Sequence, residues 1–213
     1  VGVGAFTLTE SEIVNQRGET VALFRNGGYR YNPHPKDASP ASRGAPEAGR
    51  TQQPKQREIP PARASYIDWG KQRYFEDVNE GDEVPSVTTH LTVQRMVIAA
   101  GSNRDFNPIH HNTEAAQAQR NPEMFINNGS IQTLWERVYR EFAGLDGMVK
   151  KVGPFRMRIF NPVGDSVVTQ GTVKRKWQEN GENLVELELW TESSLGVSVG
   201  PGPILLTLPS KPS

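Results

Sequence analysis

The sequence predicts an α+β domain in which one long amphipathic helix packs against a run of antiparallel strands. Apolar residues recur at steps of three and four between about residues 129 and 142, which is the spacing of a helix with one buried face. After residue 148 the chain consists mostly of β-prone stretches separated by turns that contain Gly, Asn and Pro. A helix and a sheet that each bury one face form a compact layered unit.

The chain begins with a predicted β-hairpin within residues 1–31. Residues 12–24 contain two β-prone stretches around an Asn-Gln-Arg-Gly turn. A lone hairpin is marginally stable in water, so we expect it to pack on a larger unit. Residues 9–21 also resemble residues 191–199 in outline. We therefore interpret residues 1–31 as the last hairpin of a first, incomplete repeat; an unrelated hairpin arm is the alternative.

Residues 32–65 differ in composition from both flanking parts of the chain. Seven prolines punctuate this segment, and large apolar residues are nearly absent from it. A segment of this composition cannot bury a core, so we expect an extended, protease-sensitive linker. It would join the hairpin to a domain formed by residues 66–213.

The expected elements of this domain follow from turn and capping signals. A polar turn at residues 76–83 precedes a predicted strand at residues 86–92. Thr92 would cap a helix at residues 93–100, and Asn112 or Thr113 would cap a short helix that ends near Pro122. The long helix has an apolar stripe made of Ile131, Leu134, Trp135, Val138 and Phe142. The strands predicted after it cover residues 149–160, 166–178, 184–191 and 197–208.

Composition excludes several classes of function. The formal net charge is +0, so there is no electrostatic case for nucleic acid or an anionic membrane as a partner. The chain contains no cysteine, which excludes disulfides and thiolate chemistry. No apolar run approaches the length of a membrane span, and the first residues lack the layout of a signal peptide. We expect a cytoplasmic protein.

The segment from Asp105 to His110 carries the most chemical information. Proline disfavours helical geometry at the preceding residue and fits the first position of a helix, so Asn107 should end an extended segment and Pro108 should open a turn. In one continuous helix Asp105 and His110 would lie about 140° apart around the axis. The break lets both side chains point at one water molecule, and an acid and a base around one water suggest its addition or removal. Asn107 as a plain cap of that turn is the alternative.

Residues 97–112 read Val-Ile-Ala-Ala-Gly-Ser-Asn-Arg-Asp-Phe-Asn-Pro-Ile-His-His-Asn. This run resembles the signature of MaoC-like (R)-specific enoyl-CoA hydratases and dehydratases, whose pattern Asp-x-Asn-Pro-aliphatic-His is met at every fixed position. The order of elements from about residue 74 to residue 209 resembles the family too. In that family a Gly often precedes the Asp, where this chain has Arg104, and an acidic residue often stands in place of Asn112.

The resemblance implies a hotdog fold, in which an antiparallel sheet wraps around a central helix. It also implies a double-hotdog relative, with residues 1–31 as the C-terminal hairpin of a partly represented N-terminal hotdog of the fatty-acid-synthase dehydratase type. Residues 66–213 would form the complete MaoC-like hotdog.

The resemblance also implies roles for individual residues. Asp105 and His110 would hold and activate the water, and Asn107 would orient that pair. The backbone N–H of Gly129 would meet the thioester carbonyl, with Asn128 beside it where the family often has His. The first N–H groups of a helix are unpaired and lie at the positive end of its dipole, so a developing oxyanion would be stabilised there. A plain helix start is the alternative.

Together these features predict an enzyme that adds water to 2-enoyl-CoA thioesters or removes it from (3R)-3-hydroxyacyl thioesters. No metal or redox cofactor is expected, since the thioester itself acidifies the α-carbon. The substrate would carry coenzyme A or acyl carrier protein. A second hotdog unit, from another copy or another chain, is expected as a partner. A hotdog thioesterase that uses Glu136 or Glu141 and a non-catalytic acyl-binding subunit are the alternatives. Residues 124–137 resemble a subgroup linked to steroid or branched-acyl degradation.

Overall fold

The computed structural model describes residues 4–31 and 71–212 and divides the chain into two compact units, Val1–Gln53 and Pro54–Ser213. The predicted linker at residues 32–65 lies outside the described residues. No helix among the described residues is long and apolar enough to span a membrane.

The first unit contains a two-stranded antiparallel hairpin of β1 (Gly4–Val14) and β2 (Thr20–Tyr31), which confirms the predicted hairpin and extends it at both ends. The Asn15 side-chain oxygen accepts hydrogen bonds from the backbone N–H of Arg17 at 2.9 Å and of Glu19 at 3.1 Å. Gly18 has a φ of +79°, a conformation that glycine adopts without steric cost. Local turn chemistry therefore sets this hairpin.

The hairpin exposes apolar side chains that ordinary folded units bury. All residues of β1 are exposed, including Phe6 and Leu8. These two alternate along the strand and so lie on one face, and Leu23, which is paired with Glu12, lies on that same face. Two strands without a core are marginally stable at best, so this face requires a cover.

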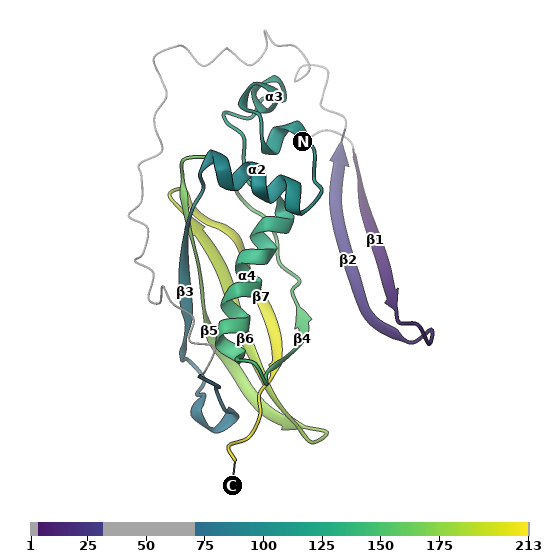
Figure 1. Cartoon of the computed structure of the whole chain (residues 1–213), viewed down its shortest axis with the longest axis vertical. Helices are drawn as coiled ribbons and strands as arrows, with labels where there is room; N and C mark the ends of the chain where they lie inside the picture. The colour runs from purple at the N-terminus through teal and green to yellow at the C-terminus, as the bar shows by residue number, and fades with distance from the viewer. Residues whose placement is uncertain (1–3, 32–70, 213) are drawn as a thin grey trace. The chain divides into compact units, whose positions relative to one another are not determined.

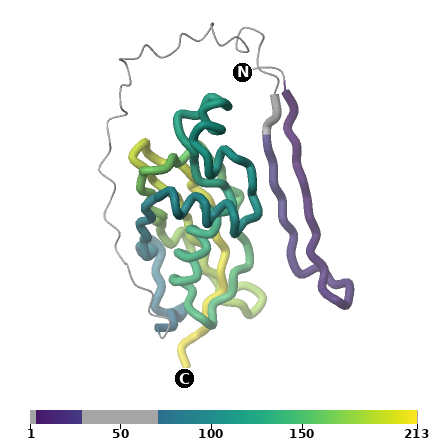
Figure 2. Tube along the Cα trace, turned by 45° about the horizontal axis from the view of Figure 1, so that its top comes forward, coloured from purple at the N-terminus to yellow at the C-terminus, as the bar shows by residue number. Residues whose placement is uncertain are grey.

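The second unit is built on a five-stranded antiparallel sheet in the order β3-β5-β6-β7-β4. Figure 1 shows the helix α4 running along one side of this sheet, and Figure 2 shows the same layers in a tilted view. The strands are β3 (Glu83–His90), β4 (Met148–Val152), β5 (Ser166–Glu179), β6 (Glu182–Ser193) and β7 (Gly196–Thr207).

The core lies between the sheet and α4 (Asn128–Ala143). Ile131, Trp135, Val138 and Phe142 of the predicted stripe are fully buried, so the helical periodicity is confirmed. The indole N–H of Trp135 donates to the Thr191 hydroxyl on β6 at 2.8 Å, which satisfies the polar atom of a buried ring. A sheet curved around one central helix is the expected hotdog fold.

The shorter elements confirm the capping signals. They are η1 (Phe75–Asp77), α2 (Val93–Ser102), η2 (Pro108–His110) and α3 (Thr113–Ala118). The Thr92 hydroxyl accepts from the backbone N–H of Arg95 at 3.3 Å and caps α2. Of the two candidates for α3, Asn112 is the cap, because its side-chain oxygen accepts from the backbone N–H of Ala115 at 2.9 Å.

The predicted strand at residues 149–160 is wrong in its second half, since β4 ends at Val152. Gly153 has a φ of +77°, outside the extended region, and Pro154 has no N–H to donate to a ladder. The chain contacts β7 again at an isolated bridge between Met157 and Val199, where the backbone N–H groups of Arg158 and Ile159 donate to the Ser198 carbonyl. This departure sends residues after 157 toward the segment that precedes α4, where Pro162 bridges to Phe125.

Candidate active site

The C-terminus of α2 sets the position of Asp105. The backbone N–H of Asp105 donates to the carbonyl of Ala100 at 2.9 Å, and that of Arg104 donates to Gly101 at 3.1 Å. This pair of bonds is a Schellman motif, which needs a left-handed residue after the cap. Arg104 is that residue, with a φ of +53°. The motif explains on physical grounds why glycine is favoured at this position.

The turn between Asp105 and His110 has the predicted break. Asn107 is extended, with φ −62° and ψ 120°, and Pro108 opens the 3-10 helix η2. The Asn107 side-chain oxygen accepts from the backbone N–H of Ile109 at 3.4 Å, as the capping interpretation requires. The backbone N–H of Asn107 also lies 3.5 Å from Asp105 Oδ1. Asn107 thus shapes the turn and contacts the carboxylate.

The turn brings the predicted acid and base together. His110 Nε2 lies 3.4 Å from Asp105 Oδ2, and the side chains are 12% and 40% exposed respectively. His110 Nδ1 lies 2.9 Å from the carbonyl oxygen of Phe125. A carbonyl only accepts, so Nδ1 carries a proton; in the neutral form of the ring Nε2 is then the unprotonated nitrogen, and it faces the carboxylate. Two adjacent acceptors of this kind can each take a hydrogen bond from one water molecule.

Aromatic rings flank this pair. The Phe125 ring meets the His110 ring edge-on, with centroids 5.0 Å apart, and stacks on Phe160 at 4.3 Å. Phe160 is 55% exposed and Phe106, next to Asp105, is 69% exposed. The acid–base pair therefore lies next to accessible apolar surface, which an acyl group can contact.

The start of α4 forms the second part of the site. Asn127 is the N-cap, and its side-chain oxygen accepts from the backbone N–H of Ser130 at 2.9 Å. Asn128 is the first helical residue and is exposed, and Gly129 is the second. Within the described residues no group accepts a hydrogen bond from the Gly129 backbone N–H. A free donor at a helix N-terminus favours a negatively charged oxygen.

Sequence reasoning missed two residues of this region. Asn127 could have been found, because an Asn three residues before Ser130 fits an N-cap. Asn103 gave no local signal. Its side-chain NH₂ donates to Ser130 Oγ at 2.8 Å and to Asn127 Oδ1 at 3.2 Å.

The other candidates lie apart from the acid–base pair. His111 lies on the same loop, with Nε2 3.4 Å from the carbonyl oxygen of Phe106. Glu136 pairs with Arg140 at 2.8 Å, and Glu141 pairs with Arg137 at 3.2 Å, so both carboxylates of α4 are held by guanidinium groups. In the described part of the chain, no three His, Asp or Glu side chains form a group able to hold a metal ion.

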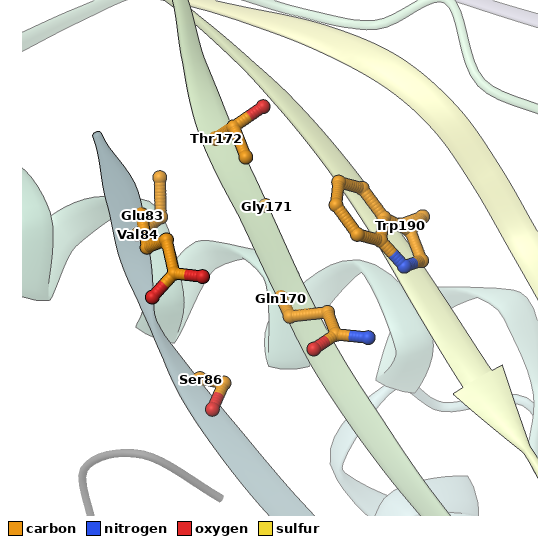
Figure 3. Close-up of a pocket in the computed structure, with 7 residues that line it drawn as sticks. All are labelled: Glu83, Val84, Ser86, Gln170, Gly171, Thr172 and Trp190. Atoms are coloured by element: carbon orange, nitrogen blue, oxygen red, sulfur yellow. The ribbon is translucent and has the colours of Figure 1, made fainter. Parts of the chain in front are cut away.

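A small hollow lies elsewhere, on strands β3, β5 and β6 (Figure 3). Its lining includes Glu83, Gln170 and Trp190 and neither member of the Asp105–His110 pair. Its volume of about 50 Å³ accommodates water but not a thioester, since sites for small organic ligands occupy roughly 300–1,000 Å³.

Fold and site define a hotdog protein with an Asp–His pair on the turn after α2 and a free N-terminus of α4 linked to that turn by hydrogen bonds. Comparison with protein families and with curated proteins finds no match. Solved structures do match. A MaoC-like dehydratase is 18% identical with a TM-score of 0.72, and the match covers 99% of this chain and 66% of that one.

Two further structures match the chain over a smaller part. R-hydratase PhaJ1 from Pseudomonas aeruginosa is 16% identical with a TM-score of 0.58, and the match covers 65% of this chain and 86% of that one. A chain of the ChsH1–ChsH2 complex from Mycobacterium tuberculosis is 22% identical with a TM-score of 0.56, over 61% of this chain and 98% of that one. The resemblance to MaoC-like proteins is therefore confirmed as a shared fold.

Proposed function

We propose that this chain is a hydratase/dehydratase that interconverts 2-enoyl and (3R)-3-hydroxyacyl thioesters. The observation that carries the proposal is the contact of His110 Nε2 with Asp105 at 3.4 Å, with Nδ1 held by a carbonyl. A water-handling acid and base in this arrangement suit addition or removal of water. The matching structures described as an R-hydratase and as a MaoC-like dehydratase support it.

During hydration, Asp105 and His110 would each accept a hydrogen bond from one water molecule and align its oxygen with the β-carbon. As the carbon–oxygen bond forms, one of the pair takes the proton of the water, and the electrons of the double bond move toward the thioester carbonyl. The Gly129 N–H would stabilise the resulting enolate oxygen. Return of a proton to the α-carbon completes the addition. The thioester itself acidifies the α-carbon, so this route requires no metal or redox cofactor.

The proposed enzyme works as part of a pair of hotdog units. The exposed apolar face of the hairpin and the apolar surface beside Asp105 both favour a neighbouring unit, and clefts between such units commonly bind small ligands. One matching chain belongs to a complex of two proteins, ChsH1 and ChsH2. We propose that the hairpin adds its strands to the neighbouring unit, which another copy or another chain supplies.

Product analysis tests the proposed function. Short, long and ring-bearing enoyl-CoA thioesters would be incubated with the protein, and the products separated on a chiral column. Formation of (3R)-3-hydroxyacyl thioesters supports the proposal, and the preferred acyl group identifies the substrate. Release of free coenzyme A would indicate a thioesterase instead. Tight binding of thioesters without turnover would indicate an acyl-binding subunit and overturn the proposal.

A further inference from the structure

We infer that Asn103 is a positioning residue, whose side chain holds the loop that bears Asp105 against the first turn of α4 that bears Gly129. The inference rests on the proposed function, because it concerns how the two parts of the proposed site are aligned. Three sets of contacts carry it.

The first set is a pair of hydrogen bonds from one amide. Asn103 is the C-cap of α2 and precedes Asp105 by two residues. Its NH₂ group donates to Ser130 Oγ at 2.8 Å and to Asn127 Oδ1 at 3.2 Å. Both acceptors are buried residues of the α4 start, so losing the amide would leave polar atoms with fewer partners. The tie joins segments that are 24 and 27 residues apart in the chain.

The second set is a close approach to Gly129. A Cβ added at Gly129 would lie 3.1 Å from Cγ, 3.2 Å from Oδ1 and 3.3 Å from Nδ2 of Asn103. The carboxamide therefore packs directly on the Gly129 Cα, and any other residue at 129 would push it aside. Glycine is needed here for this contact, since position 129 is helical and needs no left-handed backbone.

The third set is a pair of hydrogen bonds at the other end of the loop, where His110 and Ile109 contact Phe125. His110 Nδ1 donates to the carbonyl of Phe125 at 2.9 Å, and the backbone N–H of Phe125 lies 3.4 Å from the carbonyl of Ile109. Residues 103–110 are thus fixed to residues 125–130 at both ends, with Asp105 between the ties. Without Asn103, the backbone bonds to α2 would still hold Asp105 on its own helix, but of these two links to residues 125–130 only the one at His110 and Ile109 would remain.

Kinetics of three single variants test the role. Asn103→Ala removes both bonds, and Asn103→Asp keeps the size but places a second acceptor opposite Asn127 Oδ1. Misplacement by about 1 Å can cost on the order of 10²-fold in rate, so we expect kcat for enoyl-CoA hydration to fall about 10- to 100-fold, with a much smaller change in KM. Ser102→Ala is the matched control, because within the described residues the Ser102 hydroxyl bonds to Ile98 of its own helix and not to α4. It should keep the parent kcat.

A double-variant cycle separates positioning from general damage. Gly129→Ala alone should displace the Asn103 amide and lower kcat. Added to Asn103→Ala, the same change should have little further effect, because the new methyl group then has room. Rates are measured well below the unfolding midpoint of each variant. Strictly additive losses, or an Asn103→Ala kcat within threefold of the parent, would overturn the inference.

A spectroscopic readout keeps the test independent of turnover. In nuclear magnetic resonance spectra, Asn103→Ala and Asn103→Asp should shift the Gly129 amide and His110 ring signals, and Ser102→Ala should not. A parent protein that hydrates no enoyl thioester would refute the proposed function, while these shifts would still test the tie. Unchanged signals in both Asn103 variants would refute the role of Asn103.

Discussion

Asp105 and His110 lie side by side because of the residue types between them. Pro108 prevents a continuous helix, Asn107 caps the turn that it opens, and the two side chains meet at 3.4 Å. The carbonyl of Phe125 then selects the His110 tautomer that leaves Nε2 free to accept a proton. The chemistry of the site therefore depends on one turn and one backbone carbonyl.

Removing either member of the pair should abolish most of the hydration activity. General acid–base help is worth roughly 10²–10⁴-fold, so Asp105→Asn and His110→Ala should each lower kcat by that order with little change in the unfolding midpoint. His111→Ala is the control and should stay within a few-fold of the parent, because the His111 ring lies against the loop carbonyl of Phe106. Activity close to the parent in both site variants would rule out the assigned roles.

Tyr139 should make the stability of the second unit fall at alkaline pH. Burial, assisted by the negative charge of Glu136, raises the pKa of Tyr139 from 10.0 to about 12. The folded state holds the Tyr139 proton more tightly than the unfolded state does. The contribution of Tyr139 to the unfolding free energy is therefore fully present below pH 10, and it is lost as pH rises from 10 to about 12. Tyr139→Phe should remove this loss.

Chemical unfolding across that pH range measures the effect. The difference in unfolding free energy between the parent and Tyr139→Phe should fall by at most about 1.4 kcal/mol per pH unit. A difference that stays constant from pH 9 to pH 12 would show that Tyr139 titrates normally, where about 10 is the ordinary value.

At the scale of elements, the end of α2 shows a conflict between residue type and backbone. Arg104 occupies the left-handed position of the Schellman motif, where glycine is preferred. The left-handed conformation costs an L-residue roughly 1–2 kcal/mol, whereas glycine loses more backbone entropy on folding, by about 0.5–1 kcal/mol. These terms leave a small net gain for glycine.

We therefore expect Arg104→Gly to raise the unfolding free energy by about 0.5–1 kcal/mol and to preserve activity. Urea unfolding of the purified variant measures this change. Gln94→Gly, at an exposed position inside the same helix, is the matched control and should lower stability by a similar amount. If both glycine variants destabilise equally, the cap does not strain Arg104.

At the scale of the whole molecule, the described hairpin exposes large apolar side chains and has no core of its own. Leu8 and Leu23 lie on the same face of the two strands and are exposed. Since two strands alone are marginally stable, the proposed neighbouring hotdog unit supplies the missing cover.

Assembly is therefore the expected state in solution. Light scattering after size-exclusion chromatography should show an oligomer, or a complex with a partner hotdog chain. Leu8→Glu combined with Leu23→Glu should weaken this association, whereas Thr9→Glu on the opposite face should not. A strictly monomeric parent with full hydratase activity would count decisively against a site that needs a second unit.

The sequence alone determined the features that depend on local patterns. The stripe of α4, the hairpin turn at Asn15, the cap at Thr92 and the break at Pro108 all follow from residues a few positions apart. Asp105 and His110 could be predicted as a pair for the same reason, because they lie only a few positions apart around Pro108. The largest misplaced boundary in the second unit is the end of β4, where Gly153 and Pro154 end the strand although β-prone residues follow them.

The tertiary structure decided how the loop is held and which proton His110 carries. The bond from His110 to Phe125 spans 15 residues, and the bonds from Asn103 span 24 and 27. No local periodicity encodes such contacts, since they exist only after α2 and α4 pack on the same sheet. Asn103, which gave no local signal in the sequence, thus contacts Asn127, Gly129 and Ser130 at the start of α4 only in the folded chain.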